Sequence, residues 1–424
     1  MTAPSSPSPA PKWTEFLWYM SGHGTYFLAM GIQSVIYPYL VTFVLKMPAD
    51  MVGLAQTFSM LPMFGLVLLG GMTADRHELR MYLVRLQILA ATPIAAIAIL
   101  VFTKTLTFPL LVLCNFASGA IGAFVMPARD SLLNRVARRS PSGDIGQAVS
   151  YTTGVQFGMQ VVGLTIGRLV SLAGAGLMLL GVIFSLFVAA FCSTNLRPAP
   201  PGVPTGDMNR NRGEKKWQRN FREIKEGLLE VRRSQRMASV ILLMFLGGIF
   251  VMGILFVMLQ ILIRDVYHGD IGDYTIIMIC FTVGITFSTT MIGRFFTIHH
   301  QGRAMMITFA NGALVLTLIH LHPPLWGLYL LIFLWGTTAG VTMSTSRTIV
   351  QELAIESHRA RIMSVFQLGF LGGAPIGALL TGYITRILGP LDTALVAATG
   401  IALAWIGLFF LTDLWHLKRQ TAAI

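Results

Sequence analysis

Long apolar stretches separated by short polar segments dominate this chain. A hydrocarbon core about 30 Å thick needs roughly 20 apolar residues for one helix to cross it. The stretches that meet this requirement cover residues 16–45, 50–73, 80–102, 105–134, 144–170, 174–194, 236–264, 271–297, 303–321, 324–350, 360–386 and 390–413. The pattern predicts an all-α polytopic membrane protein with twelve transmembrane helices, and this even number places both termini on one side.

The second half of the sequence repeats the glycines of the first half at a nearly constant offset. Gly31 recurs as Gly253 and Gly71 as Gly293, each 222 residues later. Further pairs, at offsets of 218 and 211, are Gly122 with Gly340, Arg129 with Arg347, and Gln156 with Gln367. Parallel duplication of apolar helices is typical of transporters whose substrate site lies between two halves. We therefore expect two pseudo-symmetric six-helix lobes, at 16–194 and 236–413.

The remaining segments are predicted to be tails and a linker. Residues 1–15 are rich in Pro and Ser and should form a disordered cytoplasmic tail, with a second tail at 414–424. The segment 195–235 joins the two lobes. Its second part spaces apolar residues alternately four and three apart, which predicts an amphipathic helix on the cytoplasmic membrane surface: Trp217, Phe221, Ile224, Leu228 and Val231.

Charge supports this arrangement and predicts its orientation. Hydrophobic residues make up 54% of the 424 residues and charged residues only 12%, about half the share typical of soluble domains. The net charge is +13, yet 24 of the 31 Lys and Arg fall in cytoplasmic segments if the termini are cytoplasmic, five fall opposite and two lie inside helices. This distribution follows the positive-inside rule, so the basicity indicates topology and no nucleic-acid partner.

Polar residues inside the helices are the candidates for a substrate cavity or for coupling. His23 lies in the first helix and can bind a proton near neutral pH, or it can be a packed histidine bonded to a backbone carbonyl. Arg129 and Arg347 either face the cavity and favour anionic groups, or cap cytoplasmic helix ends. Neutral hydrogen bonds along the cavity are expected from Tyr26, Gln33, Tyr37, Asn115, Gln156, Gln160, Gln260 and Gln367.

Several other chemistries find no support in the sequence. The three cysteines, Cys114, Cys192 and Cys280, have no metal-ligand spacing, and the 23 Met residues read as fillers of apolar gaps. No nucleophile–base or zinc-ligand constellation indicates an enzyme. No ATP-binding P-loop is present. We expect no metal and no cofactor, and uphill transport would draw on an ion or solute gradient.

The loop after the second helix resembles that of the major facilitator superfamily, which reads G-x-x-x-D-R-x-G-R-[RK]. The match holds at Gly71, Asp75 and Arg76, and it departs at Glu78, with Arg80 as the second cation. The resemblance implies the major facilitator fold. It also implies a cytoplasmic latch of Gly71, Asp75, Arg76 and Arg80 with Asp130, an acid at the end of the fourth helix; an ordinary charged turn is the alternative.

Residues 124–129, 347–351 and 373–377 are similar to the branch that holds the enterobactin exporter and macrolide efflux proteins. In the fifth helix, Arg168 stands where the antiporter motif of exporters has its last glycine. The resemblance implies a secondary transporter, a monomer in the bacterial inner membrane. It would export an anionic or neutral amphipathic compound, such as a siderophore or drug. Coupling to protons, coupling through the substrate's own ionisation and the absence of coupling are the alternatives. Import of a siderophore, metabolite or metal chelate is the alternative, and a transport-dead sensor a more distant one.

Overall fold

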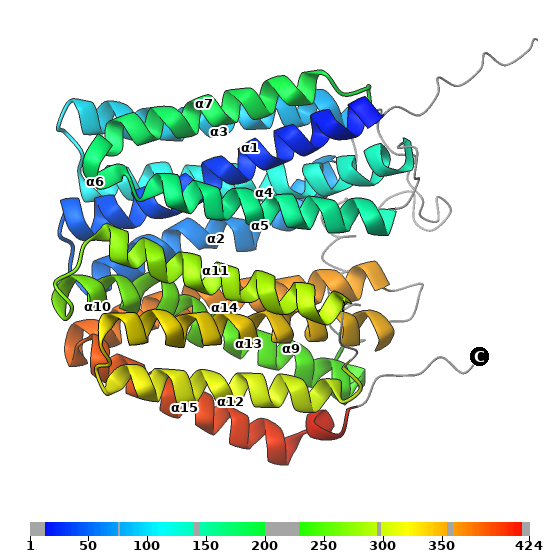
Figure 1. The fold of residues 1–424 in the computed structure, drawn as a ribbon. Helices are drawn as coiled ribbons and strands as arrows, with labels where there is room; N and C mark the ends of the chain where they lie inside the picture. The colour runs from blue at the N-terminus through cyan, green and yellow to red at the C-terminus, as the bar shows by residue number, and fades with distance from the viewer. Residues whose placement is uncertain are drawn as a thin grey trace, which may run out of the picture.

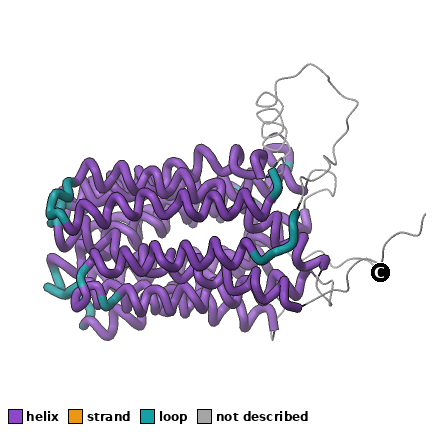
Figure 2. Tube along the Cα trace, turned by 90° about the horizontal axis from the view of Figure 1, so that it is seen from above, coloured by secondary structure: helices purple, strands orange, loops and turns teal. Residues whose placement is uncertain are grey.

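Helices make up most of the described chain, which comprises residues 13–74, 77–139, 145–199, 229, 231–294, 298–353 and 359–417 of a computed structural model (Figure 2). Within these residues, 12 helices are long and apolar enough to cross a membrane. The predicted fold class is thereby confirmed. The tails before residue 13 and after residue 417, and most of the predicted amphipathic helix, lie outside the described residues.

The first lobe contains helices α1 to α7, which pack together in one half of the molecule (Figure 1). Its elements are α1 (Trp13–Pro38), η1 (Tyr39–Val44), α2 (Ala49–Ala74), α3 (Leu79–Phe102), α4 (Phe108–Arg139), α5 (Ile145–Gly167), α6 (Val170–Ala173) and α7 (Ala175–Thr194). The fourth helix extends beyond its predicted end at 134, with Arg138 and Arg139 in its last turn. Cations there interact favourably with the C-terminal end of the helix dipole.

The second lobe occupies the other half of the molecule (Figure 1). Its elements are α9 (Gln235–Gly247), η2 (Gly248–Met252), η3 (Ile254–Met258), α10 (Leu259–Asp265), α11 (Ile271–Arg294), α12 (Gln301–His320), α13 (Leu325–Leu353), α14 (Arg359–Leu388), α15 (Pro390–Leu411) and η4 (Asp413–His416). The segments η1, η2 and η3 are π-helical. They were not predicted, because the apolar pattern fixes the length of a helix and not its local winding.

The described chain begins and ends at the same face of the helix bundle (Figure 1). We call this face the termini face, and the opposite face the far face. The largest contacts between the lobes are those of α2 with α14 and of α5 with α11. Because α2 starts at the far face while α14 ends there, the two helices lie antiparallel along the boundary.

Two glycines of this pair bring the backbones of the lobes into contact. A Cβ atom added to Gly53 would lie 2.6 Å from the carbonyl oxygen of Ala378 and 2.9 Å from the Cα of Gly382. A Cβ atom added to Gly382 would lie 2.8 Å from the Cα of Gly53. Small residues let helices touch backbone to backbone inside a membrane, where van der Waals packing drives their association. The absence of side chains at both positions therefore sets the distance between the lobes.

Candidate functional site

A buried arginine lies inside the first lobe. Arg129 of α4 is 2% exposed, and its guanidinium carbon lies 4.2 Å from the ring centroid of Tyr26 and 5.3 Å from that of Phe27, both on α1. One guanidinium nitrogen reaches the carbonyl oxygen of Gly22 at 3.5 Å, whereas Nε and Nη1 have no hydrogen-bond partner among the described residues. Aromatic faces attract the cation. They do not replace the hydrogen bonds that a buried guanidinium needs.

His23 belongs to the same cluster. Its side chain is 5% exposed and lies between two aromatic rings of α1, with centroid distances of 5.7 Å to Tyr19 and 4.9 Å to Phe27. Neither imidazole nitrogen has a hydrogen-bond partner within the described part of the chain. The Tyr19 hydroxyl donates to the backbone carbonyl of Arg129 at 3.1 Å. The structure thus brings together His23, Tyr26 and Arg129, which the sequence predicted separately.

The neutral candidates fall into different places. Tyr37 of α1 lies beside Asn115 of α4, and both are buried, but the Tyr37 hydroxyl has no well-formed hydrogen bond to any described residue. Gln33, Gln156 and Gln160 are half-buried and Gln367 is exposed.

Gln260 lies in the contact between the lobes, away from the Arg129 cluster. Its side chain is buried and accepts a hydrogen bond of 2.8 Å from the hydroxyl of Thr42 in the first lobe. It also donates to the carbonyl oxygen of Phe256 and to the hydroxyl of Tyr274. This residue therefore helps to close the far side.

Three arginines at the far face also lie across this contact. Arg264, next to α10's last residue, donates to the carbonyl oxygens of Thr42 at 3.2 Å and Met47 at 2.8 Å. Arg386 of α14 forms an ion pair with Asp50 of α2. Deeper in, the hydroxyl of Thr57 donates to the carbonyl of Pro375 at 3.0 Å, and the ring of Phe64 lies against Gly372.

The third arginine is Arg168, which stands where the antiporter motif has its last glycine. A Cβ atom added to Gly272 in the first turn of α11 would lie 3.0 Å from Nε of Arg168 and 2.9 Å from a carboxylate oxygen of Asp270. The guanidinium thus reaches the other lobe beside an acid. The hydrogen bonds and the ion pair recorded between the lobes, for the described residues, all lie in the far half of the bundle or near its middle.

The predicted latch is described only in part, because Asp75 and Arg76 lie outside the described residues. At Gly71, an added Cβ atom would lie 4.0 Å from Cβ of Pro127 on α4. Asp130 is exposed, and the charges that act on it include Arg347 of the second lobe, which is exposed as well. Among the described residues no ion pair joins Arg80 to Asp130.

Glu78, the departure from the family motif, ties the start of α3 to the end of the first lobe. Its carboxylate accepts from the backbone N–H of Met81 at 2.8 Å and of Ala199 at 2.7 Å. Arg80 donates to the carbonyl oxygen of Leu196 at 3.2 Å. Partial burial acts against ionisation of Glu78, but the backbone hydrogen bonds and the Arg80 charge outweigh it and lower the pKa of the carboxyl.

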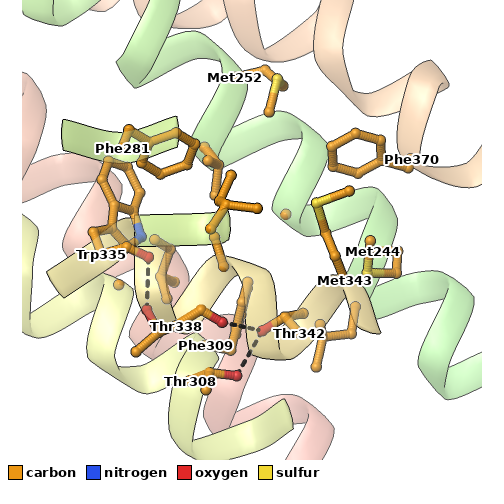
Figure 3. A pocket seen from close by; sticks show the side chains of 17 residues that line it. Met244, Met252, Phe281, Thr308, Phe309, Trp335, Thr338, Thr342, Met343 and Phe370 are labelled. Atoms are coloured by element: carbon orange, nitrogen blue, oxygen red, sulfur yellow. Dashed lines mark hydrogen bonds between the residues drawn. The ribbon is translucent and has the colours of Figure 1, made fainter. Parts of the chain in front are cut away.

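A pocket inside the second lobe contains none of the predicted site residues. Its volume is about 90 Å³, and its walls come from α9, η2, α11, α12, α13, α14 and α15 (Figure 3). Phe281, Phe309, Trp335, Met343 and Phe370 are among its lining residues. Sequence reasoning missed it because an apolar wall made by several helices has no local signature.

The whole length of the described chain matches one protein family. The model of the family described as "Transmembrane secretion effector" matches residues 13–422. The chain belongs to this family. It is therefore a secondary transporter of the major facilitator superfamily and not an enzyme, and the predicted resemblance to the branch of the enterobactin exporter and macrolide efflux proteins is confirmed. Among curated proteins, none matches the sequence significantly.

Solved structures of other transporters share this fold at low sequence identity. A mutant form of the nucleoside transporter NupG is 14% identical, with a TM-score of 0.75, and the match covers 93% of this chain and 99% of that one. A bacterial homolog of the human lysosomal transporter Spinster, in an inward-facing and occupied conformation, is 14% identical, with a TM-score of 0.70. The match covers 99% of this chain and 100% of that one. These matches show the fold.

The far-side contacts lead to a prediction for Arg264. Arg264→Gln removes the two hydrogen bonds to Thr42 and Met47, so we expect the backbone amides of residues 39–47 to exchange with deuterium several-fold faster. Hydrogen–deuterium exchange with mass spectrometry measures this. Lys104→Gln is the matched control, since Lys104 is an exposed far-face cation. Equal exchange in both variants would contradict a closing role for Arg264.

Proposed function

We propose that this transporter exports an anionic or neutral amphipathic compound, such as a siderophore or drug, from the cytoplasm by alternating access. The description of its family as a secretion effector supports export. The excess of Lys and Arg in segments on the termini face supports cytoplasmic termini and a bacterial inner membrane location. The transporter would act as a monomer, with a small-molecule substrate and the membrane lipids as its partners.

With cytoplasmic termini, the far face is the outer face of the membrane protein, and the conformation of the described residues is closed on that face. Among the described residues, the hydrogen bonds and the ion pair between the lobes lie in the far half or near the middle, whereas Asp130, Arg347 and Gln367 near the termini face are exposed. An exporter loads its substrate from the cytoplasm in such a state. The similarity to an inward-facing Spinster homolog supports this interpretation.

The preference for an anion rests on one observation, the incompletely bonded guanidinium of Arg129. Two of its nitrogens have no partner among the described residues, although the side chain is 2% exposed. A buried charge without hydrogen bonds is costly, and an ionisable group inside a membrane protein points by default to a function. A carboxylate or phosphate that reached Arg129 would supply the missing acceptors in the geometry that guanidinium prefers. Organic cations would be repelled.

His23 is the proposed site of proton coupling. The titratable or charged groups around it, among the described residues, are Tyr19 and Tyr26 on its own helix and Arg129 on α4. A positive charge on the imidazole would lie close to that of Arg129. Binding of an anionic substrate group would compensate one of the two charges, so proton and substrate binding would be linked.

The latch at the termini face is proposed to close in the opposite state. When the lobes rock together there, Asp130 of the first lobe would meet Arg347 of the second, since their charges already interact in this structure. Gly71, Asp75, Arg76 and Arg80 would act beside this pair, as the family resemblance implies.

Direction and charge preference are tested together with carboxyfluorescein as an anionic probe and ethidium as a cationic one. Inside-out membrane vesicles should accumulate carboxyfluorescein more than tenfold faster than vesicles without the protein, and ethidium at the background rate. Accumulation only in right-side-out vesicles would instead establish import. Arg129→Gln should reduce carboxyfluorescein transport more than tenfold, whereas Arg303→Gln, a change on another helix, should have little effect.

Coupling is tested separately with His23→Gln in proteoliposomes. The variant should lose transport driven by a pH gradient and keep counterflow, because it still binds substrate but no longer carries a proton. His299→Gln serves as the control, since His299 is exposed. Undiminished gradient-driven transport in His23→Gln would remove this residue from the coupling mechanism.

A further inference from the structure

We propose that the pocket inside the second lobe binds the uncharged end of the transported compound, a branched alkyl or aryl group that carries one hydrogen-bond acceptor. This inference rests on the proposed function, because it assigns the apolar end of the same amphipathic substrate. It places that end in the lobe opposite the Arg129 cluster.

The walls of the pocket are aromatic rings and thioethers, and no charged residue lines it within the described chain. Phe281 and Trp335 meet edge to face, with ring centroids 5.9 Å apart (Figure 3). The indole of Trp335 is 3% exposed, whereas Met343 is 44% exposed, so the pocket leads from an open rim inward to the indole. Such a lining suits apolar groups and excludes ions, which would lose their hydration without compensation.

Three threonines in the wall of the pocket make hydrogen bonds within the protein through their hydroxyl groups. Thr308 and Thr342 share a hydrogen bond of 2.6 Å, and Thr342 also donates to the carbonyl of Thr338. Thr338 donates to the carbonyl of Trp335 at 2.9 Å and accepts from Asn311 (Figure 3). The hydroxyl protons thus remain within the wall, and these residues do not require a polar ligand.

The indole N–H of Trp335 is the polar group that remains available. It makes no hydrogen bond in the part of the chain that the structure describes, unlike the indole of Trp405, which donates to the carbonyl of Met306 at 3.0 Å. Buried Trp N–H groups usually find an acceptor. A carbonyl or ether oxygen on the ligand would satisfy this donor, and for that reason the proposal includes one acceptor.

The size of the pocket limits the group that fits. A volume of about 90 Å³ is several times the roughly 10–15 Å³ that a cavity needs, on this measure, to hold one water molecule, and it is enough for a branched alkyl group. An aromatic ring needs more room. Met244, Met252 and Met343 line the space, and their unbranched side chains can change rotamer to provide it.

Gly247 offers a way to fill the pocket without distorting the helices. This residue lines it, and a Cβ atom added there would meet no atom within 4 Å. Gly407 of α15 is the matched control, because an added Cβ atom there also meets nothing within 4 Å and the residue does not line the pocket. Leucine at position 247 should therefore occupy the pocket, and leucine at position 407 should not.

The test uses 4-phenylbutanoate and 4-(4-acetylphenyl)butanoate, which share a carboxylate and a ring and differ in one carbonyl acceptor. Equilibrium binding to the full-length protein in lipid nanodiscs should weaken at least tenfold for both probes in Gly247→Leu and remain unchanged in Gly407→Leu. Trp335→Phe, which keeps an aromatic ring, should lower the affinity for the acetyl probe roughly threefold to tenfold more than that for the plain probe.

The outcomes separate this inference from the proposed function. If Gly247→Leu binds both probes like the wild type, the pocket assignment is overturned, while outward transport of the probes by the wild type would still uphold export. If Gly247→Leu loses binding but the wild type moves the probes only inward, export fails and the pocket stands. Loss of a retained lipid from Gly247→Leu in native mass spectrometry, with unchanged probe affinity, would assign the pocket to an acyl chain and refute the proposal.

Discussion

The backbone contact between α2 and α14 is the constraint on which the arrangement of the two lobes depends. Gly53 and Gly382 bring these helices so close that neither position has room for a Cβ atom. Inside a membrane, water does not drive the helices together, so this packing and the hydrogen bonds beside it must hold the lobes. The contact lies toward one face, so that among the described residues the lobes are joined at the far side and near the middle.

This constraint explains why the polar groups near the boundary have different roles. Arg264, Arg386 and Gln260 surround the glycine contact and bond to the opposite lobe. Arg129 and His23 lie within the first lobe and lack complete hydrogen bonding among the described residues. In the proposed transport cycle, the first group stabilises one conformation and the second responds to a ligand. The second lobe contributes an apolar pocket, so the two related lobes offer a substrate different chemistry.

The fold could be predicted from the sequence because each apolar stretch has the length that a bilayer requires, independently of tertiary contacts. The sequence named His23, Tyr26 and Arg129 separately but could not show that they form one cluster, since the contact between α1 and α4 is a tertiary one. Gln260 was predicted to line the cavity, and the structure places it in the lobe contact, where it bonds to Thr42; the apolar pattern could not show this because it does not fix how two lobes meet. In the sequence, Arg168 only marks the loss of a glycine from the antiporter motif. Its contact with Gly272 of α11 depends on where that helix lies, which the sequence does not show. The apolar pocket had no signature at all.

The central claim is that the lobes rock about the α2–α14 contact, so that one face opens as the other closes. Double electron–electron resonance in nanodiscs tests it most directly, with one spin-label pair at Thr105 and Leu321 on the far face and another at Arg138 and His299 on the termini face. All four positions are exposed. Saturation with carboxyfluorescein should lengthen the far-face distance in the same fraction of molecules in which the termini-face distance shortens. Distances that change in the same direction, or a far-face distance that stays fixed in protein that transports the probe, would contradict the account.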